Sequence, residues 1–132
     1  MHHSRVSTLM IDCLADDFDA SLDFWSAALG LKPARRPGPK QRYVTLGQLE
    51  GPITVRLQKV TRDAGYHLDM ETDDKRAETR RLETVGARRK YRIRRWWVME
   101  DPSGNAFCVI APESRTFPRH ARSWPGAAQD EE

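Results

Sequence analysis

Three side chains have the types and spacing needed for acid–base chemistry: His67, Asp69 and Asp12. His67 and Asp69 stand two positions apart in a stretch that alternates like a strand, so they share one face. A carboxylate beside a histidine orients the imidazole or exchanges a proton with it. A histidine that only packs or forms a hydrogen bond is the alternative, and the sequence leaves both interpretations open.

Asp12 and Asp69 occupy matching positions in an internal repeat. Residues 10–17 and 67–74 align without a gap and share Asp at three of eight positions, and each copy is followed by an amphipathic stretch that ends at a glycine. If the two copies pair, the two carboxylates come close together and one pKa rises, which provides an acid–base pair or a cation site. In the alternative, each carboxylate accepts backbone or arginine hydrogen bonds and has a structural role.

The elements that must position these residues follow from periodicity. Phe18, Leu22, Trp25 and Leu29 form the apolar stripe of a helix that Asp16 or Asp17 caps and Gly30 ends. A second helix is predicted from its cap at Asp74 through Val85, with few apolar contacts, and Gly86 ends it. Alternation predicts strands at 9–14, 41–46, 53–60, 67–71, 88–93, 96–100 and 106–110.

The order strand, helix, three strands, twice over, predicts an α+β fold. We expect two paired βαβββ modules, at about 6–60 and 66–111, forming a cupped mixed sheet with helices on its outer face. The strand directly after the first helix is poorly defined. Residues 1–112 are then a single domain, and 113–132 read as a flexible C-terminal tail.

The parity of the strands predicts a site. The helices bury Leu9, Ile11, Cys13, Leu68 and Met70, so the opposite face presents Met10, Asp12, His67, Asp69 and Glu71. That face is the expected lining of a cavity. Cys108 either points into the same cavity or is a small buried apolar side chain.

Composition limits the function classes. Charged residues are 31% and apolar residues 39% of the chain, and it lacks a run of about 18 apolar residues or a signal peptide, so a cytoplasmic protein without a membrane partner is expected. Residues 88–97 mix arginines with aromatic side chains, which also occurs on nucleic-acid surfaces. A net charge of only +3 disfavours nucleic acid as the partner.

Three segments resemble the vicinal oxygen chelate superfamily of glyoxalases, bleomycin-resistance proteins and extradiol dioxygenases. Residues 17–31 are similar to its first helix, 67–74 to the start of its second module and 97–109 to its closing hairpin. Its small bacterial glyoxalase-like branch is the most similar. The resemblance implies paired βαβββ modules and, as a default, a homodimer.

Metal-using members place ligands at positions that correspond here to Met10, His67, Cys108 and one residue within 54–58. Only His67 matches, and segment 54–58 contains neither a carboxylate nor a histidine. A catalytic zinc normally needs three protein ligands. We therefore predict no metal site and no cofactor, and metal-dependent glyoxalase or dioxygenase activity is disfavoured.

Three functions remain open. The first is metal-free binding of a small organic molecule, as in resistance proteins, with Trp96, Trp97 and Tyr43 stacking on the ligand and Arg56 pairing with its anionic group. The second is a lyase or isomerase that uses His67 with Asp69 or Asp12 as acid–base groups. The third is a regulatory or scaffold domain whose cup is filled by side chains.

Overall fold

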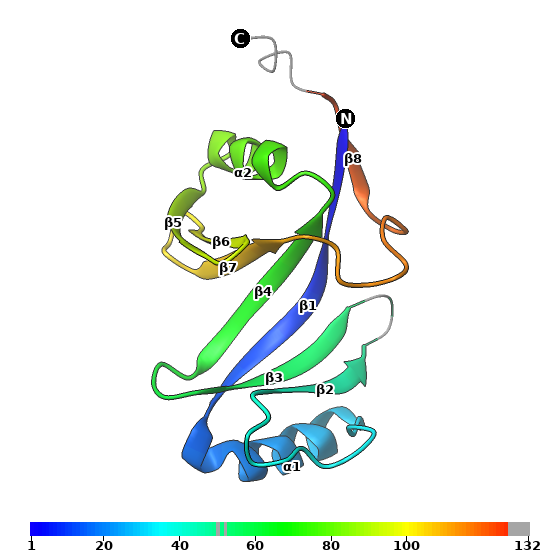
Figure 1. Cartoon of the computed structure of the whole chain (residues 1–132), viewed down its shortest axis with the longest axis vertical. Coiled ribbons are helices and arrows are strands. Elements are labelled where there is room, and N and C mark those ends of the chain that lie inside the picture. Colours follow the sequence, from blue (N-terminus) through cyan, green and yellow to red (C-terminus); the bar gives the residue numbers. More distant parts are fainter. Residues whose placement is uncertain (50, 52, 127–132) are drawn as a thin grey trace. The chain divides into compact units, whose positions relative to one another are not determined.

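The structure is a computed structural model that describes residues 1–49, 51 and 53–126 of the 132-residue chain. It contains two compact units (Figure 1). The N-terminal unit is Thr8–His67, and the C-terminal unit combines Met1–Ser7 with the chain from Leu68 onward. Helices and a mixed set of parallel and antiparallel strand pairs make the fold α+β, as predicted.

The N-terminal unit is one helix on a small mixed sheet. Its elements are the end of β1 (His2–Leu14), a 3₁₀ turn (Ala15–Asp17), α1 (Phe18–Leu29), β2 (Tyr43–Gln48) and β3 (Thr54–Val60). β3 lies in the middle, because β1 pairs with it in parallel and β2 pairs with it antiparallel.

The apolar stripe of α1 packs on this sheet as predicted. Phe18 and Leu22 are buried, and Trp25 packs against them with part of its surface covered. Gly30 ends the helix in the left-handed conformation, with φ of 69°, which a glycine adopts without strain. The strands contribute Ile11, Cys13, Val44, Leu46, Val55 and Leu57 to this core.

Two local predictions for this unit differ from the structure. The helix begins after a 3₁₀ turn, and the Asp17 side chain makes no capping hydrogen bond. Residues 31–42, which are described throughout, contain no strand. Pro33, Pro37 and Pro39 lack the N–H that a strand ladder needs, so this module is βαββ.

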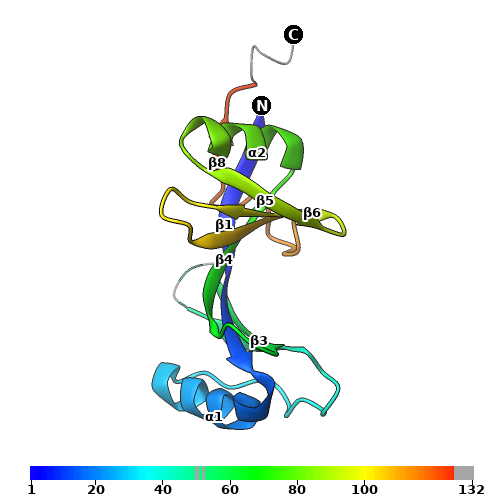
Figure 2. The same ribbon diagram turned by 90° about the vertical axis from the view of Figure 1, so that its left-hand side faces the viewer.

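The C-terminal unit contains a complete βαβββ module. It consists of β4 (Gly65–Thr72), α2 (Lys75–Thr84), β5 (Arg88–Ile93), β6 (Trp96–Glu100) and β7 (Ala106–Ile110). The last three strands have the predicted bounds. β4 pairs in parallel with β7, which pairs antiparallel with β6, and β6 with β5. Figure 2 shows α2 lying over the β5 and β6 strands.

Helix α2 buries polar side chains. Asp74 caps it as predicted, because its Oδ1 accepts a hydrogen bond from the Ala77 N–H at 3.0 Å. Glu78 is fully buried, and its carboxylate binds Arg81 twice and the His2 ring once, each at 2.8 Å. These partners compensate for taking a charge out of water. Among the described residues, no helix is long and apolar enough to cross a membrane.

The segment after β7 is tied to the C-terminal unit, which differs from the predicted flexible tail. A short strand, β8 (Arg122–Trp124), pairs antiparallel with the start of β1. The Arg5 guanidinium donates to the Arg119 carbonyl and to the Ser114 and Thr116 hydroxyls. Polar side chains buried under the segment therefore fix residues 113–126, a signal that hydrophobic patterning does not contain. Residues 127–132 of the predicted tail lie outside the described residues.

Candidate functional site

One face of the N-terminal sheet carries the predicted chemistry. The core residues of β1, β2 and β3 point toward α1, so the residues between them point to the other side, which we call the polar face. Strand register arranges this face in two rows across the sheet. Asp12, Gln58 and Tyr43 form one row, and Met10, Arg56 and Thr45 form the other.

Asp12 holds His67. The Asp12 Oδ2 atom lies 2.8 Å from His67 Nδ1, with side chains that are 16% and 17% exposed. An ionised carboxylate only accepts hydrogen bonds, so Nδ1 carries the proton and donates it to this bond. In the neutral imidazole, this tautomer places the ring lone pair on Nε2, which is then the basic atom. The sequence predicted Asp69 or Asp12 as the carboxylate partner of His67, and this bond comes from Asp12.

Two polar atoms on the polar face are buried without a hydrogen-bond partner among the described residues: Asp12 Oδ1 and Arg56 Nε. Buried polar atoms are nearly always paired, so each such atom needs an explanation. Asp12 Oδ1 is an acceptor beside the hydrogen bond to His67. Arg56 Nε is a cationic donor on the neighbouring row. A bound molecule that has both an acceptor and a donor would satisfy both atoms.

Tyr43 and Arg56, both predicted ligand residues, contact each other on this face. The Arg56 guanidinium carbon lies 5.1 Å from the centre of the Tyr43 ring, a cation–π geometry. Gln58 Nε2 donates to the Tyr43 hydroxyl at 3.1 Å. These contacts fix the positions of both side chains. Gln58 was considered in the sequence only as a missing metal ligand, and its pairing with Asp12 identifies it as part of this face.

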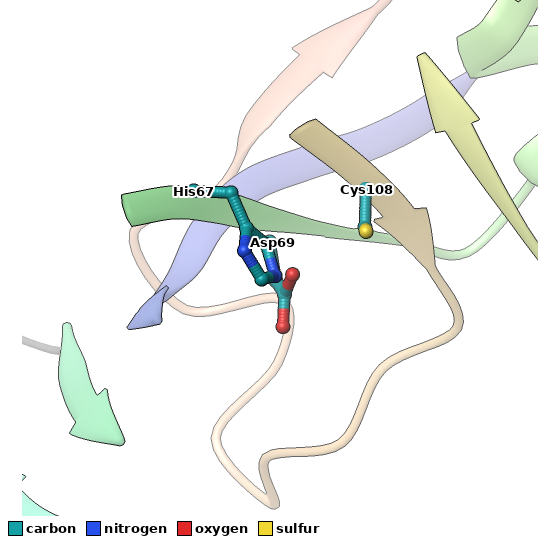
Figure 3. Close-up of side chains that lie close together, drawn as sticks. All are labelled: His67, Asp69 and Cys108. Carbon is teal, nitrogen blue, oxygen red and sulfur yellow. The ribbon is translucent and has the colours of Figure 1, made fainter. Parts of the chain in front are cut away.

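Asp69 and Cys108 are directly opposite each other on the paired strands β4 and β7. Figure 3 shows these two side chains as sticks on their strands. Cys108 is partly buried and is not part of a disulfide.

The two tryptophans of β6 lie on opposite faces of their strand. Val98 pairs with Cys108, so Trp96 shares the Cys108 face, and Trp97 lies on the α2 side. The Trp97 ring contacts Arg89 and Arg92 there, with guanidinium carbons 4.9 and 5.7 Å from its centre. Of the predicted ligand residues in this unit, Trp97 thus lies on the opposite face of the sheet from Trp96 and Cys108.

The residues at the metal-ligand positions do not fit a hard divalent cation. Met10 is a thioether with 3% exposure, and its strand partner is the cationic Arg56. Hard cations need oxygen ligands, and a guanidinium at the second position repels them. At the His67 position, the Nδ1 atom is already used by Asp12.

Structural comparison shows the same fold in proteins of low sequence identity. Methylmalonyl-CoA epimerase from Mycobacterium tuberculosis is 18% identical over 83% of this chain and 89% of its own, with a TM-score of 0.59. A hypothetical protein from Bacillus halodurans is 12% identical over 86% of this chain and 97% of its own, with a TM-score of 0.58. A homoprotocatechuate 2,3-dioxygenase variant from B. fuscum is 16% identical over 89% of this chain and 36% of its own, with a TM-score of 0.53.

These structural likenesses concern the fold alone, whereas the comparison of sequences identifies a family. No curated protein matches the chain. The family model described as the glyoxalase-like domain matches residues 8–110, from the second half of β1 to the end of β7. This range covers both helices and every strand except the short β8. The chain therefore belongs to the glyoxalase-like domain family, within the vicinal oxygen chelate superfamily.

Proposed function

We propose that the protein binds a small carbonyl compound bearing a carboxylate on the polar face, and that His67 transfers a proton to or from it. The observation that carries this proposal is the 2.8 Å hydrogen bond between Asp12 Oδ2 and His67 Nδ1. It leaves Nε2 as the base and stabilises the imidazolium that forms when Nε2 takes a proton. The buried, unpartnered Arg56 Nε supplies a cationic donor for the carboxylate.

The reaction class follows from these groups. His67 Nε2 removes a proton from the carbon next to the carbonyl, and the C–H electron pair becomes the C=C bond of an enolate. Arg56 pairs with the negative charge on oxygen. Return of the proton to the same carbon from the other side, or to a different carbon, completes an isomerase reaction, and departure of a leaving group completes a lyase reaction. Neither route uses a redox cofactor.

Deuterium exchange tests the proton transfer without knowledge of the natural substrate. The purified protein is incubated with 2-oxobutyrate in D₂O, and proton NMR follows loss of the signal from the protons next to the carbonyl. We expect exchange faster than in buffer and its loss in His67→Gln. His120→Gln is the matched control, because His120 is an exposed histidine in the C-terminal unit. Exchange that is absent from the wild type, or retained in His67→Gln, would contradict the proposal.

Binding without turnover is the second candidate function, which the two unpartnered buried atoms favour by themselves. In that case calorimetry detects 2-oxobutyrate binding that Arg56→Gln weakens, while the NMR signal shows no exchange. Arg42→Gln is the control, because Arg42 is an exposed arginine of the same unit. Absence of binding as well as exchange would remove the polar face as a site for this class of compound.

The hydrogen bond itself has a spectroscopic test. The ¹⁵N shifts of labelled His67 are expected to show a protonated Nδ1 and an unprotonated Nε2 in the neutral ring. Asp12→Asn should mix the two tautomers, whereas Asp63→Asn, at an exposed site in the same unit, should not. Metal analysis of the same sample tests the metal-free part of the proposal. One tightly bound transition metal per chain would contradict it.

The homodimer expected from the family resemblance stays a prediction. Size-exclusion chromatography with light scattering tests it, because a dimer has twice the 15.2 kDa mass of one chain. The cytoplasmic location also stays a prediction.

A further inference from the structure

A second candidate site lies within the C-terminal unit, away from the residues used above. A cavity of about 540 Å³ opens between the first turns of α2 and the β5–β6 hairpin. Five cationic side chains line it: Lys75, Arg76, Arg89, Arg92 and Arg95. We call these residues, together with Trp97, the basic pocket.

Two carboxylates, Asp73 and Asp74, line the cavity together with the five cations, and each has hydrogen-bond donors of its own. Asp73 accepts hydrogen bonds at 2.7 Å from both the backbone N–H and the ring Nδ1 of His3. Asp74 caps α2 through the Ala77 N–H. Glu83 neutralises only Arg89, at 3.0 Å.

Three of the arginines therefore have no carboxylate partner in the described part of the chain: Arg76, Arg92 and Arg95. The basic pocket keeps an uncompensated positive charge. Each guanidinium offers a planar fork of donors that matches a phosphate or carboxylate group.

The opposite face of the same hairpin shows that this charge is segregated. Arg88 and Lys90 point to that face, and both pair with Glu100, at 3.4 Å each. A bulge in the β5–β6 pairing lies between Arg89 and Tyr91 and sets which side chains face α2. The hairpin thus carries cations on both sides. Arg88 and Lys90 share a carboxylate partner, whereas Arg92 and Arg95 have none among the described residues.

Two contacts hold the lining of the basic pocket in position. The Trp97 ring packs against the guanidinium groups of Arg89 and Arg92. The Lys75 ammonium donates to the Arg95 carbonyl, which ties the hairpin turn to the helix. Side chains fixed before binding lose less conformational entropy when a ligand arrives, so these contacts favour binding.

We propose that the basic pocket binds a small organic polyphosphate, such as a nucleoside di- or triphosphate. The excess of cations favours a ligand with several negative charges, and adjacent phosphoryl groups supply them. The cavity volume is in the range of small-molecule sites, whereas a nucleic-acid strand needs a groove that continues across the surface. This inference is independent of the proposed function of the polar face.

Calorimetry with pyrophosphate and with adenosine triphosphate tests the proposal, using the full-length protein at low salt. We expect binding of both probes that weakens at least tenfold in the double variant Arg92→Gln/Arg95→Gln. The matched control is Arg88→Gln/Lys90→Gln, which removes the same number of charges from the opposite face and should bind as the wild type does. All four side chains are exposed, so thermal melting should show that both variants fold.

Three results would overturn the proposal. In the first, pyrophosphate and adenosine triphosphate do not bind at millimolar concentration. In the second, both double variants lose binding equally, which indicates non-specific charge attraction. In the third, single-stranded oligothymidylate binds more tightly than adenosine triphosphate and loses its binding in the Arg92/Arg95 variant, which identifies a polymer as the ligand. His67→Gln should leave polyphosphate binding unchanged, so failure of one proposal is distinguishable from failure of the other.

Discussion

Arg5 and Glu71 form a buried ion pair inside the C-terminal unit. Arg5 Nε donates to Glu71 Oε1 at 2.8 Å, and the two side chains are 6% and 0% exposed. Glu71 also accepts hydrogen bonds from the N–H groups of Glu113 and Ser114 and from the Ser114 hydroxyl. Burial alone raises the pKa of Glu71, but these hydrogen bonds outweigh it, so its pKa lies below the ordinary range.

Glu71→Gln should destabilise the protein by about 3 kcal/mol at pH 7, because it leaves the Arg5 charge buried without its partner. The lowered pKa means that Glu71 stabilises the fold fully above the ordinary glutamate pKa of about 4.3 and loses this effect as pH falls through its folded value. The stability difference between wild type and variant should therefore be constant from about pH 7 to 5 and narrow below about pH 4. Urea unfolding at each pH measures it.

Glu113→Gln is the control for this prediction. Glu113 is exposed, and only its backbone N–H contacts Glu71. The variant should unfold within about 0.5 kcal/mol of the wild type at every pH. A Glu71→Gln difference that does not change between pH 5 and 3 would contradict a lowered pKa of Glu71.

Trp124 fixes β8 to the C-terminal unit. Its ring lies 3.7 Å from the Arg81 guanidinium carbon, and its Nε1 donates to Ser4 Oγ at 2.9 Å. Trp124→Ala should reduce the free energy of unfolding by about 2 kcal/mol, from the lost cation–π contact and hydrogen bond. Chemical unfolding measures this loss, and Ser123→Ala, at an exposed position of the same strand, should cost under about 0.5 kcal/mol. Equal stabilities of the two variants would show that the Trp124 contacts contribute nothing.

Much of the fold could be predicted from local patterns. The Asp74 cap, the glycines that end both helices and the bounds of β5, β6 and β7 are encoded within a few residues. The placement of residues 113–126 could not be predicted in this way. It depends on Arg5, Glu71 and Trp124, which are far apart in the sequence and whose partners are polar, so no periodicity reveals the contacts.

The candidate site was predicted in part. Strand parity placed Asp12 and His67 on the same face, but their hydrogen bond depends on how strands far apart in the sequence meet, which parity alone does not give. Trp96 and Trp97 were both predicted as ligand residues. The strand register puts them on opposite sides of β6, because neighbouring residues of a strand point in opposite directions. The aromatic and basic composition of the hairpin did not show which face carries which side chains.

The two cysteines should differ in reactivity, since their surroundings differ. Cys13 is 4% exposed, and burial raises its pKa, the nearby Asp12 charge raises it further, and a hydrogen bond from Ser21 lowers it only in part. The thiolate is the reactive form, so Cys13 stays unreactive at a pH at which an ordinary thiol ionises. Iodoacetamide at pH 8 should therefore alkylate the partly exposed Cys108 at least about tenfold faster than Cys13. Peptide mass spectrometry over time measures both rates, and in urea the two should become equal. Equal rates in the native protein would show that the N-terminal core opens readily and does not protect Cys13 beneath the polar face.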